Sequence, residues 1–187
     1  MEKPGGHRRS IRLKNFDYSS PGAYFFTACV EDRRFRFGEV LHGMMVPNKL
    51  GTLVWTGWDE LKARFGALIF DDFMVMPNHV HGILIIPSDA PAKSGGSLST
   101  VVQALKSKAI HDGALLGESC RGLWQRNYYE HVIRDEKELN RLRKYIRQNP
   151  LQWHFDHENP SAVRIINAEP WEESFDEETK GHENSSS

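Results

Sequence analysis

The chain has 187 residues, 39% of them hydrophobic and 11% aromatic, which is enough to fill the core of one domain and excludes wholesale disorder. No run of about eighteen apolar residues occurs, and none follows Arg8 and Arg9 near the N-terminus, so we expect a cytoplasmic protein without a membrane segment. Its two cysteines, Cys29 and Cys120, are too few for the disulfide framework of a secreted protein.

Charge is distributed unevenly along the chain, although the net charge is only −1. Residues 156–187 contain nine acidic and two basic side chains, so the remainder carries a net charge of +6. We therefore expect a folded body over residues 1–155 and an acidic extension over residues 156–187, the last part of which is disordered. A basic body suits a protein that binds a polyanion, because cationic side chains release counterions from a phosphate backbone. A solvated charged surface without a partner is the alternative.

The first half of the chain alternates between strand and helix patterns. An aromatic and β-branched run predicts a buried strand over residues 23–30. Apolar residues spaced by four and three predict an amphipathic helix over residues 47–65. Residues 67–76 and 79–86 are predicted strands, and the Pro77-Asn78 pair between them favours a tight reversal, so we expect a hairpin.

The second half begins with a connector rich in Pro, Gly and Ser over residues 87–97. A helix capped by Ser99 or Thr100 is predicted to run to about residue 110, followed by a strand over residues 128–133. A last helix over residues 135–149 starts with an Asp-x-x-Glu signal and ends before a proline.

The resulting order, β-α-β-β-α-β-α, predicts an α+β fold. Specifically, we expect a ferredoxin-like β-α-β-β-α-β sheet with an extra C-terminal helix that carries a tyrosine. This architecture supports many functions, so the chemistry has to be inferred from particular residues.

Two histidines stand two residues apart at the start of the strand predicted over residues 79–86. Because side chains alternate across a strand, His79 and His81 project from the same sheet face. Paired imidazoles with an open side can hold a divalent ion that polarises a phosphoryl oxygen. Histidines hydrogen-bonded at a sheet end are the alternative, and Ile83 stands where a nucleotide hydrolase of the HIT type would carry a third histidine. A metal site here needs a further ligand from elsewhere in the chain.

The helix predicted over residues 135–149 carries a tyrosine beside its buried stripe. Successive residues are about 100° apart around the helix axis. Around this axis Tyr145 lies roughly 60° from Leu142, and Asn149 lies about 20° from Leu142. Tyr145 and Asn149 are therefore neighbours: a phenol that can attack a phosphate and an amide oxygen that can bind a metal. Packing roles for both are the alternative. Four cationic side chains favour the phosphate interpretation, because they attract anions and favour phenolate: Arg141, Arg143, Lys144 and Arg147.

Together these segments resemble the HUH single-tyrosine transposases, and specifically the group associated with repetitive extragenic palindromes (REP), the REP-associated tyrosine transposases. MPNHVHGILII, residues 76–86, is similar to the histidine motif of that family, and KYIRQNP, residues 144–150, to its tyrosine motif. The intervening segments LSTVVQALKSKAI and WQRNYYEHVIRDEKEL also match. The likeness covers residues 24–153, and two ordered motifs at a suitable separation argue against chance agreement.

The resemblance implies a DNA transposase and single-strand endonuclease whose nuclease domain is the body over residues 1–155. In that family the histidine pair, here His79 and His81, holds Mg or Mn on the scissile phosphate. The tyrosine that matches Tyr145 becomes joined to the 5′-phosphate, and the polar residue four positions later, here Asn149, is the third ligand. The expected partner is single-stranded or hairpin DNA from palindromic repeats, and a monomer is slightly favoured over a homodimer.

Other residues compete with this assignment or assist it. Tyr128 and Tyr129 are rival nucleophiles. His131, which shares a strand face with Tyr129, is expected to orient a metal ligand without binding the metal itself. Two other functions stay open: a non-mobile DNA-binding regulator of the same fold, and a metal phosphodiesterase that forms no covalent link. Seven cations are expected to contact the DNA backbone, with simple solvation as the alternative: Arg8, Arg9, Arg12, Lys14, Lys106, Lys108 and Arg126.

Overall fold

The computed structural model describes residues 19–90 and 96–162. In chain order its elements are β1 (Gly22–Cys29), β2 (Gly38–Leu41), β3 (Met44–Pro47), α1 (Lys49–Arg64), β4 (Ile69–Val75), β5 (His79–Ile86), α2 (Leu98–Leu115), β6 (Tyr129–Ile133), α3 (Glu136–Gln148) and the 3-10 helix η1 (Asn149–Phe155). Every strand and helix predicted from the sequence occurs, and α2 continues past its predicted end near residue 110. β2, β3 and η1 have no counterpart in the prediction. No helix in the described part of the chain is long and apolar enough to cross a bilayer.

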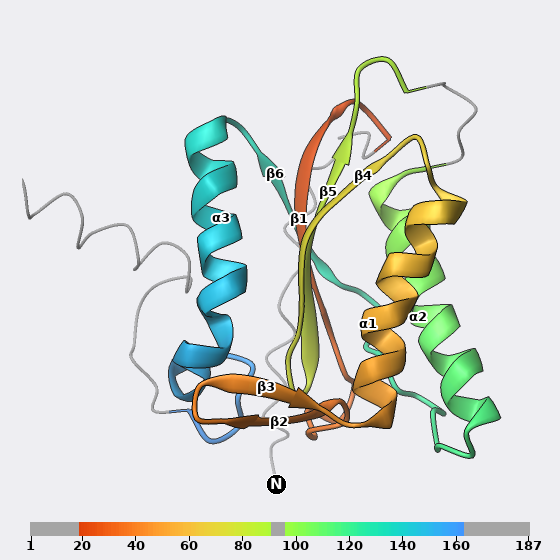
Figure 1. Cartoon of the computed structure of the whole chain (residues 1–187), viewed down its shortest axis with the longest axis vertical. Coiled ribbons are helices and arrows are strands. Elements are labelled where there is room, and N and C mark those ends of the chain that lie inside the picture. The colour runs from red at the N-terminus through yellow and green to blue at the C-terminus, as the bar shows by residue number, and fades with distance from the viewer. Residues whose placement is uncertain (1–18, 91–95, 163–187) are drawn as a thin grey trace, which may run out of the picture.

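Four strands form one antiparallel sheet in the order β4-β5-β1-β6. Each β-α-β half contributes one strand to the middle of the sheet and one to an edge, which is the ferredoxin-like arrangement. α1 and α2 cover one face of the sheet, and α3 covers the other (Figure 1). The predicted class, a ferredoxin-like α+β sheet with an extra C-terminal helix that carries Tyr145, is confirmed.

α3 starts at a capping side chain that sets its register. Asp135 Oδ1 accepts a hydrogen bond from the Glu138 backbone N–H at 2.7 Å, and the Glu138 carboxylate accepts one from the Arg134 N–H at 2.7 Å. These bonds satisfy backbone groups that the first helical turn leaves unpaired. The predicted Asp-x-x-Glu start is confirmed, and from it the helix turns Leu142 and Tyr145 toward the sheet.

β5 separates the two layers through the alternation of its side chains. Val80 and Leu84 join the large core beneath α1 and α2, whereas Ile83 joins the smaller cluster beneath α3. His79 and His81 have the same parity as Ile83, so both histidines lie on the α3 face. The sheet therefore directs the imidazoles toward the helix that carries the tyrosine.

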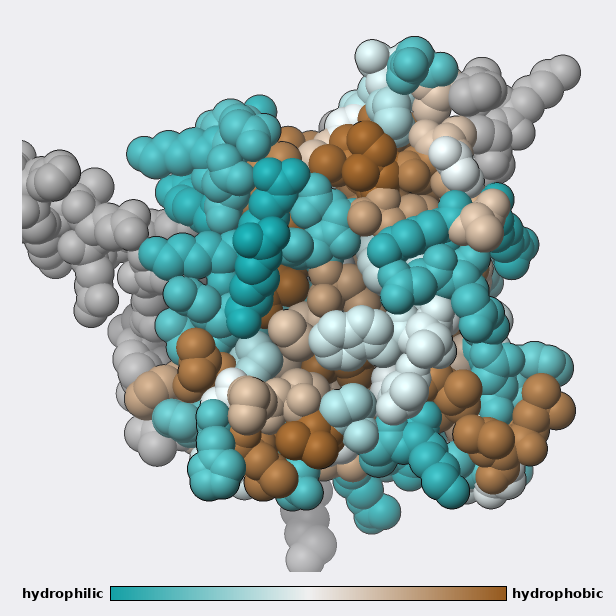
Figure 2. Space-filling model, viewed as in Figure 1, coloured by the Kyte–Doolittle hydropathy of each residue, from teal (hydrophilic) through white to brown (hydrophobic). Residues whose placement is uncertain are grey.

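The unpredicted β2–β3 hairpin adds a small second sheet at the same end of the molecule as the start of β5 (Figure 1). Its two-residue loop, His42-Gly43, has positive φ at both positions, 51° and 73°, as a type I′ turn requires. Met44 and Leu41 are 65% and 43% exposed. Apolar surface is visible at this end of the molecule in Figure 2.

Candidate metal centre and tyrosine site

The two histidines of β5 meet at their ring nitrogens. His79 is fully buried and His81 is 3% exposed. Their Nε2 atoms lie 2.9 Å apart, and the rings are nearly perpendicular, at 69°. Both Nε2 atoms therefore point at one location in a region of low dielectric, the arrangement that sequence alternation predicted for this sheet face.

The partners of the other ring nitrogens indicate how the imidazoles are protonated. The amide nitrogen of Asn78 donates to the backbone oxygens of Glu158, at 2.6 Å, and Arg33, at 3.2 Å. Asn78 Oδ1 is thus left as an acceptor, 2.9 Å from His79 Nδ1. This assigns the proton of neutral His79 to Nδ1 and a lone pair to Nε2. His81 Nδ1 lies 2.8 Å from Thr27 Oγ1, which orients the second ring.

Asp156 brings a carboxylate to the histidine pair. Asp156 is 6% exposed, and its Oδ2 lies 3.9 Å from His79 Nε2. His79, His81 and Asp156 each offer one possible ligand atom, and these three atoms all lie within 4.8 Å of one another. The sequence prediction placed Asp156 in the acidic extension over residues 156–187 and gave it no role. The described part of that extension, residues 156–162, packs against the body, and the rest lies outside the described residues.

Asn149, the residue that the resemblance offered as third ligand, is also buried here, at 2% exposure. Its Nδ2 donates to Asp156 Oδ2 at 2.9 Å. Its Oδ1 is buried without a hydrogen-bond partner among the described residues, which costs free energy unless another group binds it. Two imidazole nitrogens, a carboxylate and an unpaired amide oxygen are a donor set that suits a divalent cation.

Tyr145 approaches the same group from α3. Its hydroxyl oxygen lies 3.4 Å from His81 Nε2, and the side chain is 9% exposed. The ring packs edge-on against Phe25, with 6.2 Å between ring centroids. Of the rival tyrosines, Tyr128 packs against the core on the α1–α2 face, and Tyr129 packs against Phe25. The structure therefore places Tyr145 within reach of a group held by the histidines.

Known proteins resemble this chain in sequence and in fold. No family model matches the chain. An "Uncharacterized protein" of Haemophilus influenzae is 34% identical over 166 residues, covering 80% of this chain and 92% of the relative. A second protein of that organism, named "Putative REP-associated tyrosine transposase", is 24% identical over 150 residues, covering 73% of this chain and 74% of the relative. A solved REP-associated tyrosine transposase bound to a REP hairpin has a TM-score of 0.52 at 21% identity, covering 72% of this chain and 69% of that one. In sequence and in fold, the chain is similar to REP-associated tyrosine transposases.

Two charged pairs fix α3, the helix that carries Tyr145, to the sheet edge. Asp71 and Asp72 lie at the register shift in the β4–β5 pairing, between Phe70 and Phe73. Arg143 binds Asp71 through Nε at 3.0 Å and Nη2 at 2.6 Å, and Arg147 binds Asp72 through Nε at 2.7 Å and Nη2 at 3.0 Å. The sequence interpretation gave both arginines a phosphate-attracting role. Both guanidinium groups pair with carboxylates of β4, two residues on either side of Tyr145, and their phosphate-attracting role stays a prediction.

We expect Asp71→Asn to lower the free energy of unfolding by about 1 to 2 kcal/mol at neutral pH, because it leaves a half-buried guanidinium without its carboxylate. The hydrogen bond from Arg143 lowers the pKa of Asp71 below its ordinary value of 3.8. A lowered carboxyl pKa stabilises the fold above the ordinary value, and this contribution is lost as the pH falls toward the lowered pKa. Urea unfolding should therefore separate parent and variant at pH 7, and the separation should shrink below pH 3.8. The exposed Asp89, changed to Asn, is the control; a gap that widens in acid would contradict the assignment.

His131, predicted to support a metal ligand, lies near the N-terminal end of α3 instead of beside the histidine pair. Its Nε2 lies 2.8 Å from Glu138 Oε1, on the residue that the Asp135 side chain caps. Among the described residues this contact links His131 to the start of the tyrosine helix. The predicted role requires a hydrogen bond to His79 or His81. In the described part of the chain, the side-chain hydrogen bond of His131 is to Glu138.

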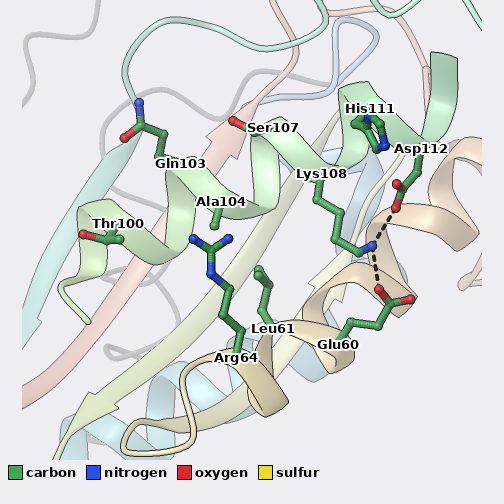
Figure 3. Close-up of a pocket in the computed structure, with 10 residues that line it drawn as sticks. All are labelled: Glu60, Leu61, Arg64, Thr100, Gln103, Ala104, Ser107, Lys108, His111 and Asp112. Atoms are coloured by element: carbon green, nitrogen blue, oxygen red, sulfur yellow. Dashed lines mark ion pairs between the residues drawn. The ribbon is translucent and has the colours of Figure 1, made fainter. Parts of the chain in front are cut away.

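Two of the lysines predicted to contact DNA already have protein partners on the α1–α2 face. Lys106 Nζ donates to the backbone oxygens of Gln125 and Asn127, and burial lowers the pKa of Lys106 to about 8. Lys108 binds Glu60 of α1 across the groove between the two helices and Asp112 on its own helix (Figure 3). DNA contacts by these lysines stay a prediction.

The remaining predicted DNA contacts divide between one described residue and four that the structure does not describe. Arg126 is exposed in the loop that leads into β6. Arg8, Arg9, Arg12 and Lys14 lie outside the described residues.

Sequence reasoning missed two features of the chain. The first is Asp156, which no local pattern distinguishes from the acidic residues that follow it. The second is the run Asp-Arg-Arg-Phe-Arg-Phe at residues 32–37, between β1 and β2. Its alternation of basic and aromatic residues was available in the sequence as a signal for nucleic-acid binding.

Proposed function

We propose that this chain cleaves and rejoins single-stranded DNA beside a hairpin, through a covalent link between Tyr145 and a 5′-phosphate. The observation that carries the proposal is the 3.4 Å approach of the Tyr145 hydroxyl to His81 Nε2, the nitrogen that faces His79 and Asp156. The phenol oxygen and the candidate metal-ligand atoms therefore lie close enough together to act on the same phosphate group. The similarity to REP-associated tyrosine transposases supports this chemistry.

His79, His81 and Asp156 would hold a divalent ion, Mg or Mn, with Asn149 Oδ1 as a further ligand. The chemistry that such an ion supplies is withdrawal of charge from the scissile phosphate. The protein prepares the site in advance: Asn78 and Thr27 orient the imidazoles, and Asn149 holds the Asp156 carboxylate. The burial of the ligands strengthens their attraction for a cation, because few water molecules compete.

Tyr145 would then attack phosphorus through its phenol oxygen. A new oxygen–phosphorus bond joins the tyrosine to the 5′ end of one DNA segment, and the bond to the 3′ oxygen of the other segment breaks. The phenol gives up its proton, and the leaving 3′ oxygen takes one up as a hydroxyl. Because the phosphotyrosine diester conserves the bond energy, attack by a 3′-hydroxyl can rejoin the strand without another energy source.

Hairpin DNA is the substrate class that the family comparison favours. The solved REP-associated tyrosine transposase with this fold is bound to a REP hairpin. In the present chain, Arg126 is an exposed cation that we assign to the DNA backbone. The same role is proposed for Arg8, Arg9, Arg12 and Lys14.

The proposal is tested by incubating the full chain with Mn and a DNA hairpin that has a single-stranded arm. We expect a protein–DNA adduct that survives denaturation in SDS, and chelation by EDTA should prevent its formation. Palindromic repeats flanking the gene supply the first hairpins to test. Cleavage without an adduct would indicate a metal phosphodiesterase, and binding without cleavage a regulator; either result would exclude the covalent mechanism.

A further inference from the structure

The loop between β1 and β2, which we call the 31–37 loop, presents an exposed aromatic ring beside an exposed cation. Phe35 is 47% exposed, and the Arg34 side chain is 81% exposed. Proteins that bind single-stranded nucleic acid combine these two features, because aromatic rings stack on bases while cations follow the phosphates. A large apolar side chain in water otherwise brings little benefit to the fold.

Contacts through Asn78 and Trp153 join this loop to the candidate metal centre. The amide of Asn78 connects them directly, since its nitrogen donates to Arg33 O at 3.2 Å while its oxygen accepts from His79 Nδ1 at 2.9 Å. A second path runs through Trp153, whose ring centroid lies 5.6 Å from that of Phe35 and 6.0 Å from that of His79. Trp153 therefore contacts both Phe35 and the candidate metal ligand His79.

The backbone holds the loop in this position at an energetic cost. Arg33 has φ of 56°, the left-handed region, which is unfavourable for a residue with a β-carbon. The hydrogen bond from Asn78 to Arg33 O secures this conformation. Strained positions that the surrounding contacts maintain are concentrated at functional sites.

The three arginines of the loop have different partners. Arg36 donates to the backbone oxygen of Ser119, and Arg33 lies 4.0 Å from the buried Glu158 carboxylate. Arg34 has only a long contact of 4.0 Å to Asp32 among its recorded ion pairs, and an exposed pair of that length contributes little. Arg34 is thus the cation of the loop that can best exchange its carboxylate for a phosphate.

We propose that Phe35 stacks on an unpaired base next to the scissile phosphate, and that Arg34 binds a backbone phosphate of the same strand. The inference rests on the proposed function and identifies the part of the substrate that this surface takes: single-stranded DNA, held without regard to sequence, since every base has a π-face. The strand would cross the 31–37 loop on its way to Tyr145.

The test measures the affinity of the full chain for fluorescent oligothymidylate by anisotropy, without metal so that no cleavage occurs. Phe35→Leu keeps the apolar volume but removes the aromatic face, and we expect binding to weaken about tenfold. Phe35→Trp, with a larger face, should bind at least as tightly as the parent. Arg34→Ala should weaken binding severalfold and reduce its salt dependence, because one phosphate contact is lost.

Arg64→Ala is the matched control for charge, since it removes one positive charge from the groove between α1 and α2 on the opposite layer (Figure 3). It should leave affinity close to that of the parent. Unchanged binding by Phe35→Leu would overturn the inference. So would an equal loss for blunt duplex DNA, or a preference of the parent for oligouridylate over oligothymidylate.

This result is separable from that of the proposed function. If no hairpin forms an adduct but Phe35→Leu still weakens oligothymidylate binding, the covalent mechanism fails and the strand-binding surface stands. If the adduct forms and Phe35→Leu binds normally, the surface assignment alone fails.

Discussion

Tyr145→Phe should abolish the SDS-resistant adduct, lowering single-turnover cleavage of a hairpin substrate by at least about a thousandfold. The expected loss is so large because the reaction has no other route to a covalent link once the phenol oxygen is gone. The remaining ring keeps its edge-on packing against Phe25, so the fold should survive. Affinity for Mn and for the hairpin should stay within about twofold of the parent, because neither depends on this hydroxyl.

The rival tyrosines supply the controls for this experiment. Tyr128→Phe and Tyr129→Phe each remove one hydroxyl from β6 or its approach, and both should form the adduct at rates near that of the parent. An adduct that persists in Tyr145→Phe and disappears in Tyr129→Phe would reassign the nucleophile. Tryptic mapping of the DNA-linked peptide identifies the modified tyrosine independently of the variants.

Local patterns were sufficient to predict much of the fold and four of the five candidate site residues. The alternation of β5 placed His79 and His81 on one face, and the helix register placed Tyr145 near Asn149. Both are properties of a single element, so a short sequence window contains the necessary information. The sheet order followed from the succession of two β-α-β units along the chain, whose crossover connections have a preferred hand.

The features that the sequence prediction missed depend on contacts between distant segments. Asp156 becomes a candidate ligand only because η1 turns the chain back over the sheet, and nothing in residues 156–187 distinguishes this carboxylate from eight other acidic side chains. The pairs of Arg143 with Asp71 and of Arg147 with Asp72 likewise join α3 to an irregular sheet edge. The β2–β3 hairpin was missed for a different reason: its strands have four residues each, and its turn is His-Gly instead of the familiar Asn-Gly.

Asp156→Asn should weaken the binding of Mn by at least about a hundredfold, since it removes the one negative charge among the candidate ligands. The substitution preserves size and shape. It does not preserve both hydrogen bonds of the carboxylate, which accepts from Glu158 N at 2.7 Å and from Asn149 Nδ2 at 2.9 Å. An amide has one oxygen, so the side chain introduced by Asp156→Asn could accept only one of these two hydrogen bonds. We therefore also expect a loss of about 1 kcal/mol in the free energy of unfolding without metal.

The two effects are distinguished by measuring stability with and without the ion. A ligand that binds only the folded state raises stability by about 2.7 kcal/mol at a hundred times its Kd, so Mn should raise the Tm of the parent. The same Mn concentration should leave the Tm of Asp156→Asn almost unchanged. Asp112→Asn is the matched control, because it makes the same chemical change at a carboxylate that binds Lys108 on the α1–α2 face. A Tm rise in Asp156→Asn equal to that of this control would remove Asp156 from the ligand set and leave the amide oxygen of Asn149 to complete the site with the two histidines.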